Sequence, residues 1–298
     1  MRPADAYEVA PPLLREMPVP VVGATDDKNA RGRVLIVGGS RETPGGVLLA
    51  GIAALRVGAG RLQIATASSA ASAMAIAVPE ARVIGLAETP TGSVSGSCAA
   101  SLSVEAGVAD ALLVGTGALD VDAMGTLLRE LLPHVGERTR VILDAAALGA
   151  LAQEQLLLCA LSDRAIIMPN PREMATLLGC DEPTVESDPV GALDEAVKRF
   201  GVVVLLRGVE TWMSAPGLPR YRDRSGHAAL GTAGSGDVLA GALAGLAARG
   251  ADPLHASLWA VHCHGRAGEA AAGRGAGIGL LARELLDELP FVLRSLEG

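Results

Sequence analysis

The chain has 298 residues, of which 50% are hydrophobic and only 2% are aromatic. One domain of this length can bury a large core, which here must be built from aliphatic side chains and alanine. The formal net charge of −8 excludes a general nucleic-acid-binding surface, because such a surface needs clustered lysine and arginine. Any bound phosphate must therefore be held by backbone dipoles and a few cations.

The cysteines and the uncharged stretches indicate the compartment. No Cys-x-x-Cys pair occurs, so the four cysteines are expected to be reduced and packed (Cys98, Cys159, Cys180 and Cys263). The first residues are charged and lack the apolar run of a signal peptide. The uncharged stretch at 62–79 contains too many polar residues for a membrane span. We therefore expect a cytoplasmic protein with no membrane partner.

The elements in chain order are those of a parallel α/β fold. Residues 1–30 are rich in proline and are expected to form an N-terminal arm. A strand at 34–37, a glycine turn, a helix at 45–57 and a strand at 62–65 make one βαβ unit. Further apolar runs predict strands at 111–114, 141–143, 166–168 and 202–206, with helices at 124–132, 145–159 and 191–200.

The remaining segments complete a single expected domain over residues 31–298. A Ser/Gly-rich stretch at 89–103 is expected to be an exposed loop. Strands at 212–214 and 220–222 are expected to form an edge hairpin, and helices follow at 234–249, 253–272 and 279–289. Because most strands are apolar throughout, we expect a mostly parallel sheet that is covered on both faces.

The turn Gly234-Ser235-Gly236-Asp237, which opens a long Ala/Leu/Gly helix, is the most specific motif. Ligands of open α/β sheets bind outside the carboxyl ends of the strands. Glycine N–H groups can converge there on an anion, and a helix N-terminus adds roughly half a positive charge. Asp237 in the first turn suits a general base that acts on a substrate hydroxyl. The alternative is an ordinary helix start in which Asp237 only complements the helix dipole.

Two histidines on an expected helix do not make a metal site. His262 and His264 are two residues apart, so they point to different faces, whereas a metal pair would use a spacing of three or four. We interpret both as structural, and the sequence predicts no metal-binding residues.

Residues 232–241, Thr-Ala-Gly-Ser-Gly-Asp-Val-Leu-Ala-Gly, resemble the signature of ADP/ATP-dependent NAD(P)H-hydrate dehydratases, a branch of the ribokinase-like superfamily. Kinases of that superfamily usually carry Gly-Ala-Gly-Asp, so Ser235 favours the dehydratase branch. Blocks at 32–40, 44–60 and 169–174 occur in the order of that family. The resemblance covers roughly residues 28–295 and implies a ribokinase-like three-layer α/β/α sandwich.

The resemblance implies the removal of water from hydrated NADH or NADPH (NADHX or NADPHX), which consumes ADP or ATP and involves Mg²⁺. It implies that Asp237 is the base. The positions that match the substrate site of the family are Gly46, Gly117, Asn170 and Asp237. The positions that match its nucleotide site are Arg207, Gly208, Val209, Glu210, Thr211, Gly234, Ser235 and Gly236. The resemblance also suggests a homo-oligomer such as a tetramer.

The sequence departs from the family mainly on the substrate side. The usual Asp-Ala-Asp-Ala-Leu has lost its second acid, which is Ala146 here. In the usual Pro-His-Pro-Gly-Glu, Asn170 replaces the histidine and Arg172 replaces the glycine. Asparagine can form hydrogen bonds but cannot titrate near neutral pH. Two alternatives stay open: a ribokinase-like kinase of a sugar or pyrimidine alcohol, and a nucleotide-binding homologue with reduced activity.

Overall fold

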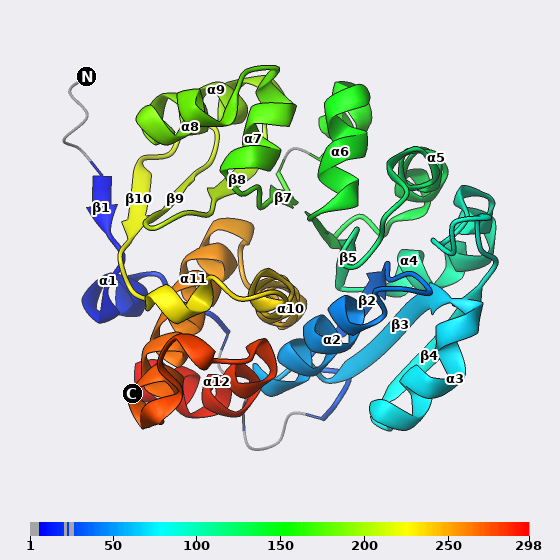
Figure 1. The fold of residues 1–298 in the computed structure, drawn as a ribbon, viewed down its shortest axis with the longest axis horizontal. Helices are drawn as coiled ribbons and strands as arrows, with labels where there is room; N and C mark the ends of the chain where they lie inside the picture. Colours follow the sequence, from blue (N-terminus) through cyan, green and yellow to red (C-terminus); the bar gives the residue numbers. More distant parts are fainter. Residues whose placement is uncertain (1–5, 21–22, 24–26, 162, 298) are drawn as a thin grey trace.

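A ten-stranded sheet forms the middle layer of the computed structural model, which describes residues 6–20, 23, 27–161 and 163–297. The strand order is β1-β10-β9-β8-β7-β6-β5-β2-β3-β4. All pairs are parallel except those of β9, which is antiparallel to both of its neighbours. Helices cover both faces of the sheet (Figure 1), which confirms the expected three-layer α/β/α sandwich.

The central strands are buried along their whole length because helices cover both of their faces. The strands expected from apolar runs are all present, with ends that differ by one or two residues. The strands are β1 (Ala6–Glu8), β2 (Arg33–Val37), β3 (Arg61–Ala67), β4 (Ala81–Leu86), β5 (Ala111–Val114), β6 (Arg140–Leu143), β7 (Ala165–Ile167), β8 (Val203–Leu206), β9 (Thr211–Ser214) and β10 (Arg220–Asp223).

One face of the sheet carries the helices that position the glycine-rich turn. They are α1 (Pro11–Glu16), α2 (Gly45–Arg56), α10 (Ser235–Ala248), α11 (Pro253–Ala271) and α12 (Ala282–Glu297). α10 lies against α2 with almost no space between the backbones: a Cβ on Gly241 would overlap with the backbone of Ala50. This contact brings the N-terminal ends of the two helices together.

The other face is covered by helices from the middle of the chain. They are α4 (Ser103–Val108), α5 (Val121–Leu131), α6 (Ala146–Gln153), α7 (Pro171–Leu178), α8 (Glu182–Ser187) and α9 (Pro189–Phe200). At the other end of the sheet, α3 (Ser68–Ala77) lies against the outer strand β4, as Figure 1 shows. Short helical turns are η1 (Gly96–Leu102), η2 (Leu132–His134), η3 (Gln155–Leu161), η4 (Ala228–Leu230), η5 (Ala272–Ala276) and η6 (Gly277–Gly279).

Three local expectations are wrong. The β9–β10 hairpin is not at the edge, because β1 from the N-terminal segment pairs with β10. The stretch at 89–103 is not simply an exposed loop, because η1 buries Cys98, Ala99 and Leu102 against α5. The expected helix at 145–159 ends at Gln153 and is followed by η3. In each case long-range packing, which a local pattern does not contain, decides the conformation.

The cysteines are all free, as expected, but they are not all packed. Cys98 and Cys263 are buried, whereas Cys159 and Cys180 are exposed. Among the described residues, no helix is both long and apolar enough to cross a membrane. The division into an arm and one catalytic domain stays a prediction, although β1 and α1 of the arm pack into the same fold.

Candidate functional site

Three segments that are far apart in the chain meet at the N-terminal end of α10. A Cβ on Gly46 would lie 3.0 Å from Gly117 Cα and 3.3 Å from Asp237 Oδ1. Gly117 itself has φ +67°, and a Cβ there would lie 2.7 Å from the carbonyl oxygen of Thr43. The Thr43 hydroxyl donates a hydrogen bond to the Gly117 carbonyl at 2.8 Å. Glycine at both positions therefore lets these segments approach closely, and a side chain at Gly46 would contact both Gly117 and the Asp237 carboxylate.

The turn before α10 has the geometry of an anion site. Gly234 is the N-cap residue with φ +91°, a conformation that favours glycine, and no side chain caps the helix. The Ser235 N–H donates to the Thr232 carbonyl at 3.3 Å, and the N–H groups of Gly236 and Asp237 keep their capacity to bind an anion. We call residues 234–237 the phosphate-binding turn. Burial raises the pKa of Asp237 to about 6, although Arg207 acts in the opposite direction. At neutral pH the carboxylate is ionised and yet basic enough to accept a proton.

Arg207 joins the phosphate-binding turn to the end of the sheet. Its Nη2 donates to Asp144 Oδ1 at 3.1 Å and to Glu173 Oε2 at 3.0 Å. Burial opposes its charge, but these carboxylates outweigh burial and raise the pKa of Arg207. The Nε atom is buried and has no hydrogen-bond partner among the described residues. A buried, charged donor without a partner at an anion site is a strong candidate for phosphate binding.

Asp144 is buried at the end of β6, directly before a strained residue. Burial raises its pKa to about 6, and the charges of Glu173 and Asp237 act in the same direction. The next residue, Ala145, has φ +49° and is the only described non-glycine residue with positive φ. Such strain persists where surrounding structure enforces it, and it is common at functional sites. Asp144 and Glu173 stand in the family motifs, yet our sequence interpretation gave neither a role.

Asn170 is engaged in a helix cap. Its Oδ1 accepts from the Glu173 backbone N–H at 2.9 Å, and Glu173 Oε2 accepts from the Asn170 backbone N–H at 2.8 Å. This is a capping box at the start of α7, and it holds Glu173 toward Arg207. The pattern Asn-x-x-Glu could have revealed it from the sequence. The cap uses one lone pair of the Asn170 oxygen, so the second lone pair and the Nδ2 group are available to a substrate.

The segment between β8 and β9 lies partly in solvent. Gly208 and Val209 are exposed, while Glu210 accepts from Arg224 Nε at 2.8 Å and Thr211 begins β9. Arg207 of this segment contacts the phosphate-binding turn, where it approaches Gly236.

His264 supports the phosphate-binding turn from behind. Its Nε2 lies 3.1 Å from Ser235 Oγ, and both residues are buried. Burial lowers the pKa of His264 to about 4, so the ring is neutral at physiological pH. The contact agrees with the structural role expected for this histidine.

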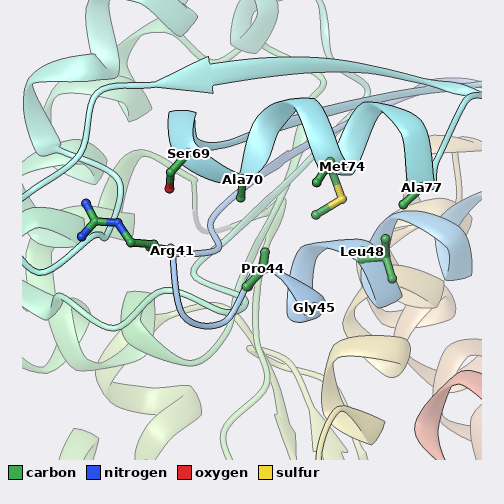
Figure 2. A pocket seen from close by; sticks show the side chains of 9 residues that line it. Arg41, Pro44, Gly45, Leu48, Ser69, Ala70, Met74 and Ala77 are labelled. Atoms are coloured by element: carbon green, nitrogen blue, oxygen red, sulfur yellow. The ribbon is translucent and has the colours of Figure 1, made fainter.

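An open pocket of about 450 Å³ lies beside Gly46, between the start of α2 and α3 (Figure 2). Its wall is mainly apolar, with Leu48 on one side and Ala73 and Met74 on the other. Arg41 is its only charged lining residue and is paired with Glu88 at the rim. The pocket could accept an apolar ring together with an anionic group.

Comparison with known proteins identifies the family. The model of the NAD(P)H-hydrate dehydratase family matches residues 34–291. The chain belongs to the NAD(P)H-hydrate dehydratase family. An ADP-dependent (S)-NAD(P)H-hydrate dehydratase from Xanthomonas campestris is 41% identical over 94% of this chain and 93% of its own length. The bifunctional NAD(P)H-hydrate repair enzyme Nnr of Moorella thermoacetica is 36% identical over 92% of the chain, which spans about half of that enzyme.

Solved structures of this dehydratase family share the fold. An ADP/ATP-dependent NAD(P)H-hydrate dehydratase from Bacillus subtilis, co-crystallised with ATP and Mg²⁺, superimposes with a TM-score of 0.81. It is 27% identical, and the match covers 98% of this chain and 99% of the Bacillus chain. A ribokinase-like protein from Enterococcus faecalis gives a TM-score of 0.85 at 21% identity, which supports the fold alone.

Proposed function

We propose that this dehydratase family member restores NADH or NADPH from NADHX or NADPHX in a reaction that consumes ADP or ATP. The observation that supports it best is the position of the Asp237 carboxylate, which lies in the first turn of α10 and close to Gly46. A hydroxyl bound beside this carboxylate would have a base on one side and a phosphate at the start of α10 on the other. Both are needed to transfer a phosphoryl group to a hydroxyl.

The reaction then has two balanced steps. In the first step, Asp237 accepts the proton of the ring hydroxyl. The hydroxyl oxygen bonds to the terminal phosphorus of the nucleotide, and the bond from that phosphorus to the rest of the nucleotide breaks. In the second step, phosphate leaves the ring carbon and the neighbouring carbon loses a proton, which forms the double bond of the dihydronicotinamide. The N–H groups of Gly236 and Asp237 and the Arg207 guanidinium would stabilise the negative charge of the transferring phosphoryl group.

The carboxylates near Arg207 fit the binding of Mg²⁺ with the nucleotide. No group of three or more metal-binding side chains occurs among the described residues. A nucleotide-bound Mg²⁺ does not need one, since it usually keeps several waters and takes one or two carboxylates besides phosphate oxygens. Glu173, which is only partly buried, is the carboxylate best placed for this role. The ion would neutralise charge on the phosphates.

The substrate is a dinucleotide, so it must extend beyond the reacting ring. We assign the pocket of Figure 2 to its distal part, because the pocket adjoins Gly46 through Pro44 and Gly45. Its apolar walls suit a base, and Arg41 suits a phosphate. A cytoplasmic location and a homo-oligomer such as a tetramer also remain proposals, and light scattering of the purified protein would test the second.

The decisive experiment supplies purified protein with NADHX, Mg²⁺ and either ADP or ATP, and follows the absorbance of reduced nicotinamide. We expect the absorbance to recover only when a nucleotide is present, with release of phosphate. A kinase of this fold would instead yield a stable phosphorylated alcohol without recovery of NADH. Nucleotide binding without recovery with either nucleotide would reject the proposed reaction and favour a nucleotide-binding homologue.

A further inference from the structure

A second pocket, of about 830 Å³, lies on the side of α11 away from the phosphate-binding turn. Residues from α1, the end of β10, α11 and α12 line it, and Figure 1 shows these helices side by side at one end of the molecule. His262 lines this pocket, whereas His264, two residues later, contacts Ser235. Two residues on a helix correspond to about 200°, so the two rings point to opposite sides. None of the lining residues belongs to the proposed dehydration site.

His262 presents a nitrogen without a partner to this pocket. The ring is buried, with a side chain only 7% exposed, and its Nδ1 lies 2.8 Å from Asp223 Oδ2. Asp223 also accepts from the backbone N–H of Ser225 at 2.7 Å and from its hydroxyl. Because a carboxylate oxygen accepts hydrogen bonds, Nδ1 is the ring nitrogen that donates in this contact. Nε2 has no hydrogen bond to any residue that the structure describes.

The pocket is rich in arginine although the protein is acidic. Arg15, Arg224 and Arg266 line it together with one carboxylate, Glu269, and Arg224 is also paired with Glu210 outside the lining. Arg224 binds Glu210 through Nε, and Arg266 binds Glu269 through Nη1, which leaves the other N–H groups of both guanidiniums available. Arg15 forms no ion pair within the described part of the chain. The three arginines thus reach one pocket from three different segments of the chain.

The dimensions and the remaining walls define the class of ligand. A pocket of this volume is typical of small-molecule sites and has room for more than an inorganic ion. Pro11, Val292 and Leu296 add apolar surface. Several guanidiniums and an imidazole suit a tetrahedral dianion with many oxygens better than a planar carboxylate, which one guanidinium satisfies. We propose that this pocket binds a phosphate ester of a small organic molecule.

In the complex, the arginines donate hydrogen bonds to the phosphate oxygens. His262 Nε2 forms a hydrogen bond with a phosphate oxygen. The organic part lies against the apolar wall formed by α1 and α12. Asp223 and Ser225 keep the ring in place.

The test uses ¹⁵N-histidine NMR of the full chain, in which the imidazole of His262 is assigned with the variant His262→Asn. Phenyl phosphate, inorganic phosphate and benzoate are added in turn. We expect a saturable shift of the His262 Nε2 signal with phenyl phosphate, a weaker one with inorganic phosphate and none with benzoate. An unmoved His262 signal with phenyl phosphate would overturn the proposal, and so would an equal response to benzoate.

Charge variants locate the binding. Arg15→Gln and Arg266→Gln should each weaken phenyl phosphate binding about ten- to hundred-fold, the effect of losing a charge-assisted hydrogen bond. Arg56→Gln removes the same charge from a surface ion pair with Asp287 and should have no effect. The His262 response must also persist in Gly236→Ala, since phosphate could bind at residues 234–237. Unchanged affinity in the first two variants, or loss of the response in the last, would show that the pocket is not the site.

Discussion

A Cβ placed on Gly236 would overlap with Nη1 of Arg207. The guanidinium therefore lies directly against the backbone of the phosphate-binding turn, where only glycine leaves room for it. Asp144 and Glu173 hold it in that position. The N–H groups of a helix start and a buried cation thus face the same small volume, which is the arrangement that phosphoryl transfer requires.

Gly236→Ala should displace Arg207 from the turn. We expect nucleotide affinity to fall at least about tenfold, because one charge-assisted contact is lost and the turn is obstructed. Isothermal titration calorimetry with ADP and ATP measures this. Gly273→Ala is the control, since nothing lies within 4 Å of a Cβ at that glycine. Equal affinity in the two variants would contradict the role of Arg207.

Asp237→Asn should reduce turnover about 10²–10⁴-fold, the usual contribution of a general base, and leave nucleotide binding nearly unchanged. In the unmodified protein, kcat/KM should fall as pH decreases through about 6, where Asp237 becomes protonated. Steady-state rates between pH 5 and 8 provide the measurement. A rate that stays constant down to pH 5 would exclude Asp237 as the base.

The same Asp237→Asn change should stabilise the fold at neutral pH. The pKa of Asp237 rises from 3.8 to about 6 on folding, so ionising it in the native state costs up to about 3 kcal/mol. Above pH 6 the charge is present and its removal stabilises the fold. As pH falls from 6 to 3.8, the native carboxylate becomes protonated, and the substitution no longer stabilises the fold. Urea unfolding at pH 7.5 and pH 4 tests this. The same difference in the free energy of unfolding between the variant and the unmodified protein at both pH values would refute it.

Ala73→Trp should fill the pocket of Figure 2 without disturbing the core, because Ala73 is exposed. If the distal part of the dinucleotide binds there, KM for NADHX should rise about tenfold or more while kcat changes little. Ile76→Trp, on the same helix but outside the pocket lining, is the matched control. The same KM in both variants would place the distal part elsewhere.

Ala145→Gly should stabilise the protein by about 1 kcal/mol, because glycine relieves the strain of φ +49°. Ala152→Gly, within α6, should instead cost about 0.5–1 kcal/mol. Thermal unfolding of the two variants gives opposite shifts in Tm if Ala145 is strained. Destabilisation by both would mean that the backbone at Ala145 carries no strain.

Much of the fold was predictable because its signals are local. Apolar runs located β2, β3 and the strands from β5 to β8, whereas β4 was not predicted. The Gly-Ser-Gly-Asp turn before a long helix indicated the anion site, since glycine conformation and the helix dipole depend only on neighbouring residues. The N-terminal segment carried no such signal, and the pairing of β1 with β10 was missed.

The sequence by itself determined the family and the parallel α/β architecture, and it predicted a phosphate-binding turn at residues 234–237. Only the tertiary structure decided that Gly46 and Gly117 lie together beside Asp237, that Arg207 lies on Gly236, and that the Asn170 oxygen caps α7. These contacts join residues far apart in the chain, and strand order and the close packing of α2 against α10 set their distances. Periodicity and spacing describe the chain along its length, so they contain no information on which distant segments meet.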